Sequence, residues 1–335
     1  MSGTKKTLAK QIDEIGELLE SAKANIEKRV IGQSEVVEQS LVALLSGGHA
    51  LLVGAPGLAK TRLVATLGTV MGLSSNRVQF TPDLMPADIL GSEILDVSED
   101  GKRGFRFLKG PIFCQLLMAD EINRASPRTQ SALLQAMQEH EVTIAGKTYE
   151  MAEPFHVLAT QNPIEQEGTY PLPEAQLDRF LLQIDVGFPS RDTEREILLA
   201  TTGFDDAKAD QVFQPEQLIA AQELVRRMPV GETVVEAILD LVRSARPTET
   251  SEKFIQDAIG WGPGPRAAQA LMLATRARAL IQGRLAPSLD DVAALAHPAL
   301  IHRMALNFAA KAQGENLDQI IADLSDKALG KEAAA

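Results

Sequence analysis

The chain has 335 residues, of which 45% are hydrophobic and 23% charged, and its 33 Lys and Arg against 45 Asp and Glu give a net charge of −12. The composition is that of a globular protein, the length suggests two domains, and no apolar run approaches the about 18 residues of a membrane span. The acidic balance argues against binding to nucleic-acid backbones, and the lone cysteine, Cys114, excludes an intrachain disulfide and favours the cytoplasm.

Apolar residues at spacings of three and four predict a helix over 5–29, and a second amphipathic helix is expected over 34–45. From residue 49 the pattern changes to short apolar runs that alternate with helical segments. The predicted strands cover residues 49–53, 77–80, 114–119, 155–160 and 181–185, and the predicted helices cover residues 60–71 and 126–139. This alternation predicts a parallel sheet with helices on both faces.

Two segments that interrupt the alternation are predicted to be β-hairpins. One covers 93–108 and turns near residue 100, and the other covers 141–151 and turns at Ala145 and Gly146. Inserted hairpins serve as working loops or as surface decoration, and both interpretations stay open at this point.

No strand is expected after about residue 203, where the pattern becomes helical. The predicted helices cover residues 214–227, 232–246, 265–282, 289–302 and 318–329. The sequence therefore predicts an α/β domain over 1–203 and an all-α domain over 204–335.

A glycine-rich loop joins the first predicted strand to the helix that follows. The candidate nucleotide-binding residues of this loop and its helix are Gly54, Ala55, Pro56, Gly57, Leu58, Ala59, Lys60, Thr61 and Arg62. Backbone N–H groups converge at such a helix N-terminus, where the helix dipole favours anions. Lys60 would reach the β- and γ-phosphates, and the Thr61 hydroxyl would ligate Mg²⁺. Because Ala59 replaces the second glycine of the usual pattern, an ordinary βα turn is the competing interpretation.

Two acids, Asp120 and Glu121, follow the predicted buried strand at 114–119. The carboxyl ends of parallel strands lie at one edge of the sheet, which brings these acids beside the glycine-rich loop. Asp120 would hold Mg²⁺ directly or through water, and Glu121 would be the general base that polarises an attacking water. A pair of helix-capping acids is the alternative.

Together these motifs resemble those of the MoxR group of AAA+ ATPases, in which alanine is usual at the position of Ala59. The resemblance covers about residues 31–302, and the segments that carry it are 54–61, 120–125, 159–180, 81–86 and 262–267. It implies a P-loop AAA+ core with a parallel sheet and inserted β-hairpins, followed by a C-terminal all-α lid domain.

The resemblance also implies roles for four further residues. Asn162 matches the sensor 1 amide that orients the attacking water, and Arg179 matches the arginine finger that reaches the γ-phosphate bound by a neighbouring subunit. Arg266 matches the sensor 2 arginine of the lid, and Gln33 resembles the residue near the adenine. The competing interpretations are that Asn162 only forms a turn, that Arg179 forms a surface ion pair and that Arg266 is solvated.

As a member of this group the protein would hydrolyse ATP with Mg²⁺, binding the nucleotide between core and lid of a hexameric homo-oligomeric ring. It would remodel or mature a protein partner, often one with a von Willebrand factor A domain. The alternatives are a DNA-working AAA+ motor, a metal-chelatase motor subunit and a scaffold that binds ATP without hydrolysis. Arg124 and Arg128 flank the acids and would act across an interface or simply be solvated.

Overall fold

The computed structural model describes residues 7–97, 103–164, 168–202 and 208–330. Two helices, α1 (Leu8–Glu27) and α2 (Ser34–Leu45), precede the sheet. Both predicted N-terminal helices are confirmed within the described residues. Among those residues, no helix is both long and apolar enough to cross a bilayer.

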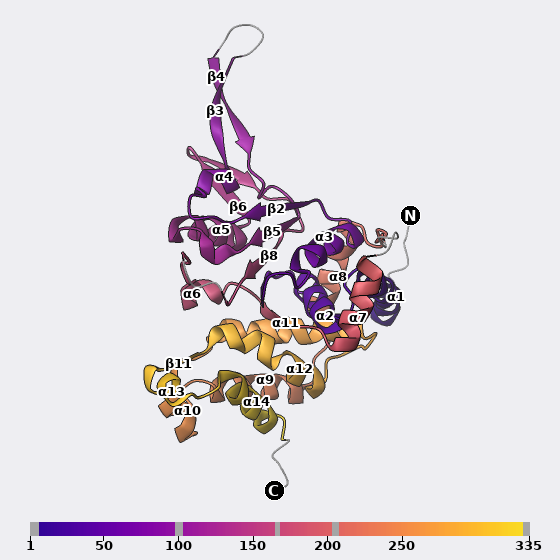
Figure 1. Cartoon of the computed structure of the whole chain (residues 1–335). Helices are drawn as coiled ribbons and strands as arrows, with labels where there is room; N and C mark the ends of the chain where they lie inside the picture. The colour runs from indigo at the N-terminus through magenta and orange to yellow at the C-terminus, as the bar shows by residue number, and fades with distance from the viewer. Residues whose placement is uncertain (1–6, 98–102, 165–167, 203–207, 331–335) are drawn as a thin grey trace.

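The centre of the molecule is a five-stranded parallel sheet in the order β2-β5-β8-β1-β9 (Figure 1). The strands are β1 (Ala50–Gly54), β2 (Ser75–Gln79), β5 (Leu116–Asp120), β8 (His156–Gln161) and β9 (Leu182–Val186). The order places β1 between β8 and β9, so that β1 and β5 both end beside β8. The predicted parallel α/β sheet is confirmed.

The three inner strands, β5, β8 and β1, are buried on both faces, and their alternate residues pack on opposite faces. On β5, Leu116 and Met118 belong to the cluster that contains α1, α2 and α3 (Lys60–Val70). Leu117 and Ala119 belong to the cluster formed with α5 (Pro127–Glu139). Burial on both faces explains why this strand has a continuous apolar sequence.

The remaining elements of the α/β region are short helices and two antiparallel hairpins. The helices are α4 (Pro86–Leu90), η1 (Ile122–Arg124), α6 (Glu174–Leu177) and α7 (Arg191–Thr201). The hairpins pair β3 (Gly91–Val97) with β4 (Arg103–Lys109) and β6 (Glu141–Ile144) with β7 (Lys147–Glu150), and the first projects from the body (Figure 1).

Both predicted hairpins are confirmed. Ala145 and Gly146 have φ values of 49° and 79°, as a tight hairpin turn requires. The predicted turn near residue 100 lies outside the described residues. Phe107 of β4 stacks on Tyr149 of β7 with ring centroids 4.1 Å apart, which joins the bases of the two hairpins.

The C-terminal region is helical, with one exception that corrects the sequence prediction. Its helices are α8 (Pro215–Arg227), α9 (Glu232–Ser244), α10 (Lys253–Ala258), α11 (Pro265–Ile281), α12 (Leu289–Leu300), η2 (Ile301–Arg303), α13 (Phe308–Gln313) and α14 (Leu317–Ala328). The predicted helical region is confirmed, but the expectation that no strand follows residue 203 is wrong, because β10 (Ile259–Trp261) and β11 (Ala305–Leu306) form a small antiparallel sheet. These strands are too short to produce an alternating pattern. The boundary near 203 stays a prediction.

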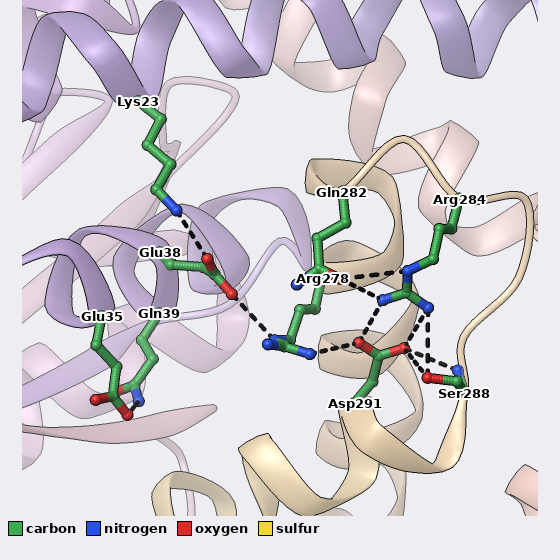
Figure 2. A network of polar contacts seen from close by, with 9 residues as sticks. All are labelled: Lys23, Glu35, Glu38, Gln39, Arg278, Gln282, Arg284, Ser288 and Asp291. Atoms are coloured by element: carbon green, nitrogen blue, oxygen red, sulfur yellow. Dashed lines mark hydrogen bonds and ion pairs between the residues drawn. The ribbon is translucent and has the colours of Figure 1, made fainter.

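A chain of ion pairs connects the N-terminal helices to the C-terminal region (Figure 2). Lys23 of α1 lies 2.9 Å from Glu38 of α2, and Glu38 lies 3.0 Å from Arg278 of α11. Arg278 and Arg284 both bind Asp291 of α12, at 2.7 and 2.6 Å. Burial raises the pKa of Asp291, but hydrogen bonds from Arg284, Ser288 and Arg278 more than offset this and hold the pKa below its ordinary value.

Replacing Asp291 with asparagine is expected to lower the free energy of unfolding by about 3 kcal/mol, because both arginines lose their shared buried carboxylate. Since folding lowers the pKa of Asp291, the stability it contributes is complete above the ordinary value of 3.8 and is lost as pH falls through the folded value. Denaturant unfolding at several pH values measures this. Asp290→Asn, at an exposed neighbour, is the control; equal losses in both variants would contradict the assignment.

Candidate active site

The glycine-rich loop between β1 and α3 has the backbone of an anion cradle. A Cβ on Gly54 would lie 2.5 Å from the carbonyl oxygen of Val186, so only glycine fits at this end of β1. Gly57 and Ala59 have left-handed φ values of 85° and 56°. Among the described residues, the N–H groups of Gly57, Leu58 and Ala59 have no hydrogen-bond acceptor. Free amides in front of a helix N-terminus fit the oxygens of phosphate groups.

Lys60 begins α3 and turns its ammonium group back over the loop. It donates hydrogen bonds to the carbonyl oxygens of Gly54 and Ala55, the latter at 2.9 Å. Burial lowers the pKa of Lys60, and the nearby carboxylates of Asp120 and Glu121 oppose that shift. A half-buried ammonium whose direct acceptors are neutral carbonyls is suited to a stronger, anionic acceptor.

A cavity of about 380 Å³ brings the loop together with residues from two other segments. Its lining residues are 56–62, Asp120, Glu121, Thr160 and Asn162. Candidates that lie up to about 100 residues apart in the sequence therefore share one cavity at the carboxyl ends of β1, β5 and β8, as open α/β sheets allow.

The two acids are held by side chains from neighbouring strands. The Thr160 hydroxyl donates to Asp120 Oδ1 at 2.5 Å and accepts the N–H of Glu121 at 2.8 Å. Arg77 of β2 donates to Asp120 Oδ2 at 2.6 Å. Glu121 has a left-handed φ of 54°, rare for a residue with a side chain, and its carboxylate accepts a hydrogen bond from Gln79 at 2.9 Å. These contacts fix the directions of both carboxylates.

Sequence reasoning did not identify Thr160, Arg77 or Gln79. Only the strand register shows that these residues lie beside the acids, since Gln79 pairs with Asp120 across β2 and β5. That register is a property of the folded sheet, although the polar residues at the ends of apolar strands were visible beforehand.

The oxygen donors in this cavity fit Mg²⁺, which prefers carboxylate, hydroxyl, phosphate and water ligands. Thr61 and Asp120 both line it. Among the described residues no group of three or more His, Cys, Asp or Glu could hold a metal by itself. Such a partial ligand set suits an ion that takes its other ligands from phosphates and water. Because Asp120 already accepts from Arg77 and Thr160, contact through water is favoured over direct ligation.

A second cavity of about 260 Å³ continues from the loop and shares Gly57, Leu58, Ala59 and Arg62 with the first. Its other lining residues are Arg29, Ile31, Gln33, Pro189, Ile197 and Thr201. The Gln33 amide nitrogen donates to Leu58 O at 3.3 Å, and its oxygen is buried with no partner among the described residues. Apolar walls with one free amide acceptor suit a nucleobase that carries an amino group.

The expectation that nucleotide binds between core and lid stays a prediction. The lining residues found for the two cavities all lie within 29–201, and no described residue of the C-terminal helices is among them. The outer wall is α7, which the sequence analysis did not single out, and the N-terminal linker before α2.

Arg179 and Arg266 lie in a different cavity of about 280 Å³, which also contains Asp178 and Arg303. One terminal nitrogen of Arg179 donates to Leu134 O at 2.6 Å, and its Nε is buried and has no partner in the part of the chain that the structure describes. Arg266 begins the first turn of α11 and lies 3.5 Å from Asp178. Neither arginine lines the loop cavity of its own chain, and the sensor 2 role of Arg266 stays a prediction.

The two arginines that flank the acids have different surroundings. Arg124 lies 3.1 Å from Glu121 Oε2 and belongs to the cluster around that carboxylate. Arg128 is exposed in the first turn of α5. Among the core side chains, Cys114 is buried, and burial raises its pKa to about 11, which disfavours a reactive thiolate.

Two segments of this chain match known protein families. Residues 49–182 match the ATPase family associated with various cellular activities (AAA), and residues 251–324 match the AAA lid domain. Chaperone MoxR1 of Mycobacterium tuberculosis is 42% identical, covering 88% of this chain and 77% of its own length. Protein MoxR of Paracoccus denitrificans is 30% identical, covering 90% and 93%. The crystal structure of an ATPase candidate from Cytophaga hutchinsonii superposes with a TM-score of 0.87 at 36% identity, covering 94% and 95%.

Proposed function

This chain belongs to the MoxR group of AAA+ ATPases, and we propose that it works as a homo-oligomeric ring whose ATP sites are each completed by a neighbouring subunit. This proposal rests on the observation that the candidate catalytic residues lie in two separate cavities. Lys60, Glu121 and Asn162 line one cavity, whereas Arg179 and Arg266 line another. Head-to-tail contacts between copies would bring the cavity of Arg179 and Arg266 in one subunit against the cavity of Lys60 and Glu121 in the next.

Within one site, each group has a distinct task. The loop amides and Lys60 bind the phosphates, and the second cavity receives the adenine beside Gln33. Glu121 takes a proton from the attacking water, which Asn162 orients. Bound Mg²⁺ would neutralise phosphate charge beside Thr61 and Asp120.

The arginines complete the site from outside. Arg179 of the next subunit stabilises the negative charge that develops on the γ-phosphate. Arg266 would also act on the nucleotide bound by the neighbouring subunit, because it shares a cavity with Arg179 and not with the phosphate loop of its own chain.

The work of the ring is the remodelling or maturation of a protein partner. Support comes from the name of the M. tuberculosis relative, a chaperone, and from the projecting hairpin β3–β4. Leu95 and Phe105 face each other across this hairpin and are 58% and 71% exposed, which suits contact with a partner. A hexameric ring, a partner with a von Willebrand factor A domain and a cytoplasmic location belong to the same proposal.

The net charge of −12 argues against a DNA-working motor. We expect single- or double-stranded DNA to leave the rate of ATP hydrolysis unchanged at about 0.15 M salt, where weak electrostatic binding is screened. A steady-state ATPase assay with and without DNA measures this. A several-fold rise would support the DNA motor, and stimulation only by a tetrapyrrole-binding partner would support the chelatase subunit.

Mixed rings test the shared site. Arg179→Ala subunits keep Glu121, and Glu121→Gln subunits keep Arg179, so rings of either variant alone lack one group at every site. In rings mixed at equal amounts about one interface in four is complete, and the rate should recover to about a quarter of wild type if sites act independently.

The controls for the mixed rings are assembly and exchange of subunits, followed by size and by energy transfer between labelled copies. If the variants exchange and the rate stays at baseline at every ratio, Arg179 does not act across the interface. Turnover absent even from the wild type, with ATP bound, would support the scaffold.

A further inference from the structure

One buried arginine of the lid touches the segment that carries Arg179. Arg303, at the end of η2, is 2% exposed and is among the largest fully buried side chains. It lies in the lid, 124 residues after Arg179 in the sequence, and the motifs of the chain do not include it.

Arg303 contacts the backbone and one side chain around Arg179. Its Nε donates to Asp178 Oδ1 at 2.8 Å. One terminal nitrogen donates to Leu181 O at 3.0 Å and to Ala299 O at 2.6 Å. The other donates to Phe180 O at 2.6 Å and to Asp178 O at 3.4 Å. The five N–H groups of a guanidinium thus have five contacts, and four of these involve the short segment 178–181.

The carboxylate of Asp178 connects this anchor to the second arginine of the cavity. Its Oδ1 accepts from Arg303, and its Oδ2 lies 3.5 Å from Arg266 of α11. Next to Arg303, His302 contacts Phe180 O at 3.0 Å. The lid therefore holds both the residue before Arg179 and the residue after it.

A buried ion pair contributes little net stability compared with apolar residues of similar size, because desolvation offsets the attraction. The pair of Arg303 and Asp178 does, however, define one geometry, since a planar fork binds several acceptors at once. That geometry fixes the backbone on both sides of Arg179 and leaves Asp178 Oδ2 within 3.5 Å of Arg266.

We propose that Arg303 is a positioning residue for ATP hydrolysis in the neighbouring subunit: it ties the lid to segment 178–181 and thereby aims Arg179 and Arg266 together. This inference rests on the proposed function of Arg179 in a shared site. It makes the lid a part of the site of the next subunit, although no described lid residue lines the nucleotide cavities of its own chain.

The test is a pair of variants, Arg303→Met, which removes the fork and keeps a long apolar side chain, and Arg303→Lys, which keeps the charge and most of the packing. We expect both to lower kcat, Arg303→Met by about 10²-fold, since a displacement of about 1 Å has that effect on a reacting geometry. Affinity for ATP in the chain's own site should be unchanged. Asp178→Asn should lower kcat in the same way.

Mixing separates positioning from general damage. Arg303→Met rings mixed with Glu121→Gln subunits should recover to about a quarter of the wild-type rate, because complete interfaces form again. Mixed with Arg179→Ala subunits they should not recover, since both variants lack a correctly placed finger. Arg278→Met disturbs another lid ion pair, far from Arg179 in sequence, and should lower stability without this pattern.

The possible results separate a failure of the role of Arg303 from a failure of the shared ATP site. Failure of Arg179→Ala and Glu121→Gln to complement each other overturns the shared site, and the inference with it. If that pair complements while Arg303→Met and Arg303→Lys keep wild-type kcat, the inference alone is overturned. Recovery of Arg303→Met with Arg179→Ala subunits also overturns it. If Arg303→Met does not fold, Arg303→Lys and Asp178→Asn decide by the same assays.

Discussion

Arg179→Ala is expected to lower the rate of ATP hydrolysis by about 10³-fold or more, the contribution of an arginine that stabilises charge on the transferred phosphoryl group. The affinity of the same chain for ATP should stay nearly unchanged, because Arg179 lies in a cavity separate from its own phosphate loop. Steady-state turnover of assembled protein and titration with a fluorescent ATP analogue measure the two quantities.

The matched control is Arg243→Ala, at a lid arginine that is 61% exposed and paired with Glu249. Its effect on turnover should be within about two-fold, as for an ordinary exposed ion pair. Wild-type turnover in assembled Arg179→Ala would remove Arg179 from the site. Arg128, exposed at the start of α5, and Arg124 would then be the next candidates for a group that acts across the interface.

Lys60→Ala is expected to weaken ATP binding by about 10²-fold or more and to reduce hydrolysis to background. The reason is the loss of charge-assisted hydrogen bonds to phosphate, each worth about 1.5–3 kcal/mol. Calorimetric titration with ATP measures the affinity. Adenosine, which has no phosphate, should bind both forms alike, because the cavity beside Gln33 is unchanged.

Lys60→Arg is the informative companion variant. A guanidinium keeps the charge, but it is larger than the ammonium that now fits against Gly54 and Ala55. We expect it to restore binding only in part, and Lys311→Ala, at an exposed lid position, to have no effect. Undiminished ATP affinity in Lys60→Ala would contradict the assignment of the loop.

Local sequence patterns were sufficient to predict most of the strands of the α/β region. The strands were predicted within one or two residues because burial on both faces produces continuous apolar runs that end at polar residues. The edge strand β2 was also predicted within two residues, although only Val78 of its five residues is buried. The hairpin at 141–151 was visible from its turn, where Ala145 and Gly146 have the backbone angles that such turns demand.

Some residues of the candidate site were also predictable from the local sequence, whereas others depend on contacts between distant segments. The roles of Lys60 and Thr61 were predicted from the glycine-rich loop before a helix. Those of Asp120 and Glu121 were predicted from their position at the end of a strand, because the carboxyl ends of parallel strands must meet at one edge. Their assignment remains a prediction for the experiments above. The side chains that hold the acids, Thr160 among them, depend on strand register, which the one-dimensional pattern leaves open.

What the sequence determined by itself was the order of elements, the phosphate loop and the acids, because these follow from local periodicity and turn chemistry. The tertiary structure decided which groups share a cavity. It separated Arg266 from the phosphate loop, made α7 a wall of the second cavity and joined Arg303 to Asp178. The physical reason is that packing between helices far apart in the chain depends on the shapes of both partners, and neither shape is encoded in the spacing of residues along one of them.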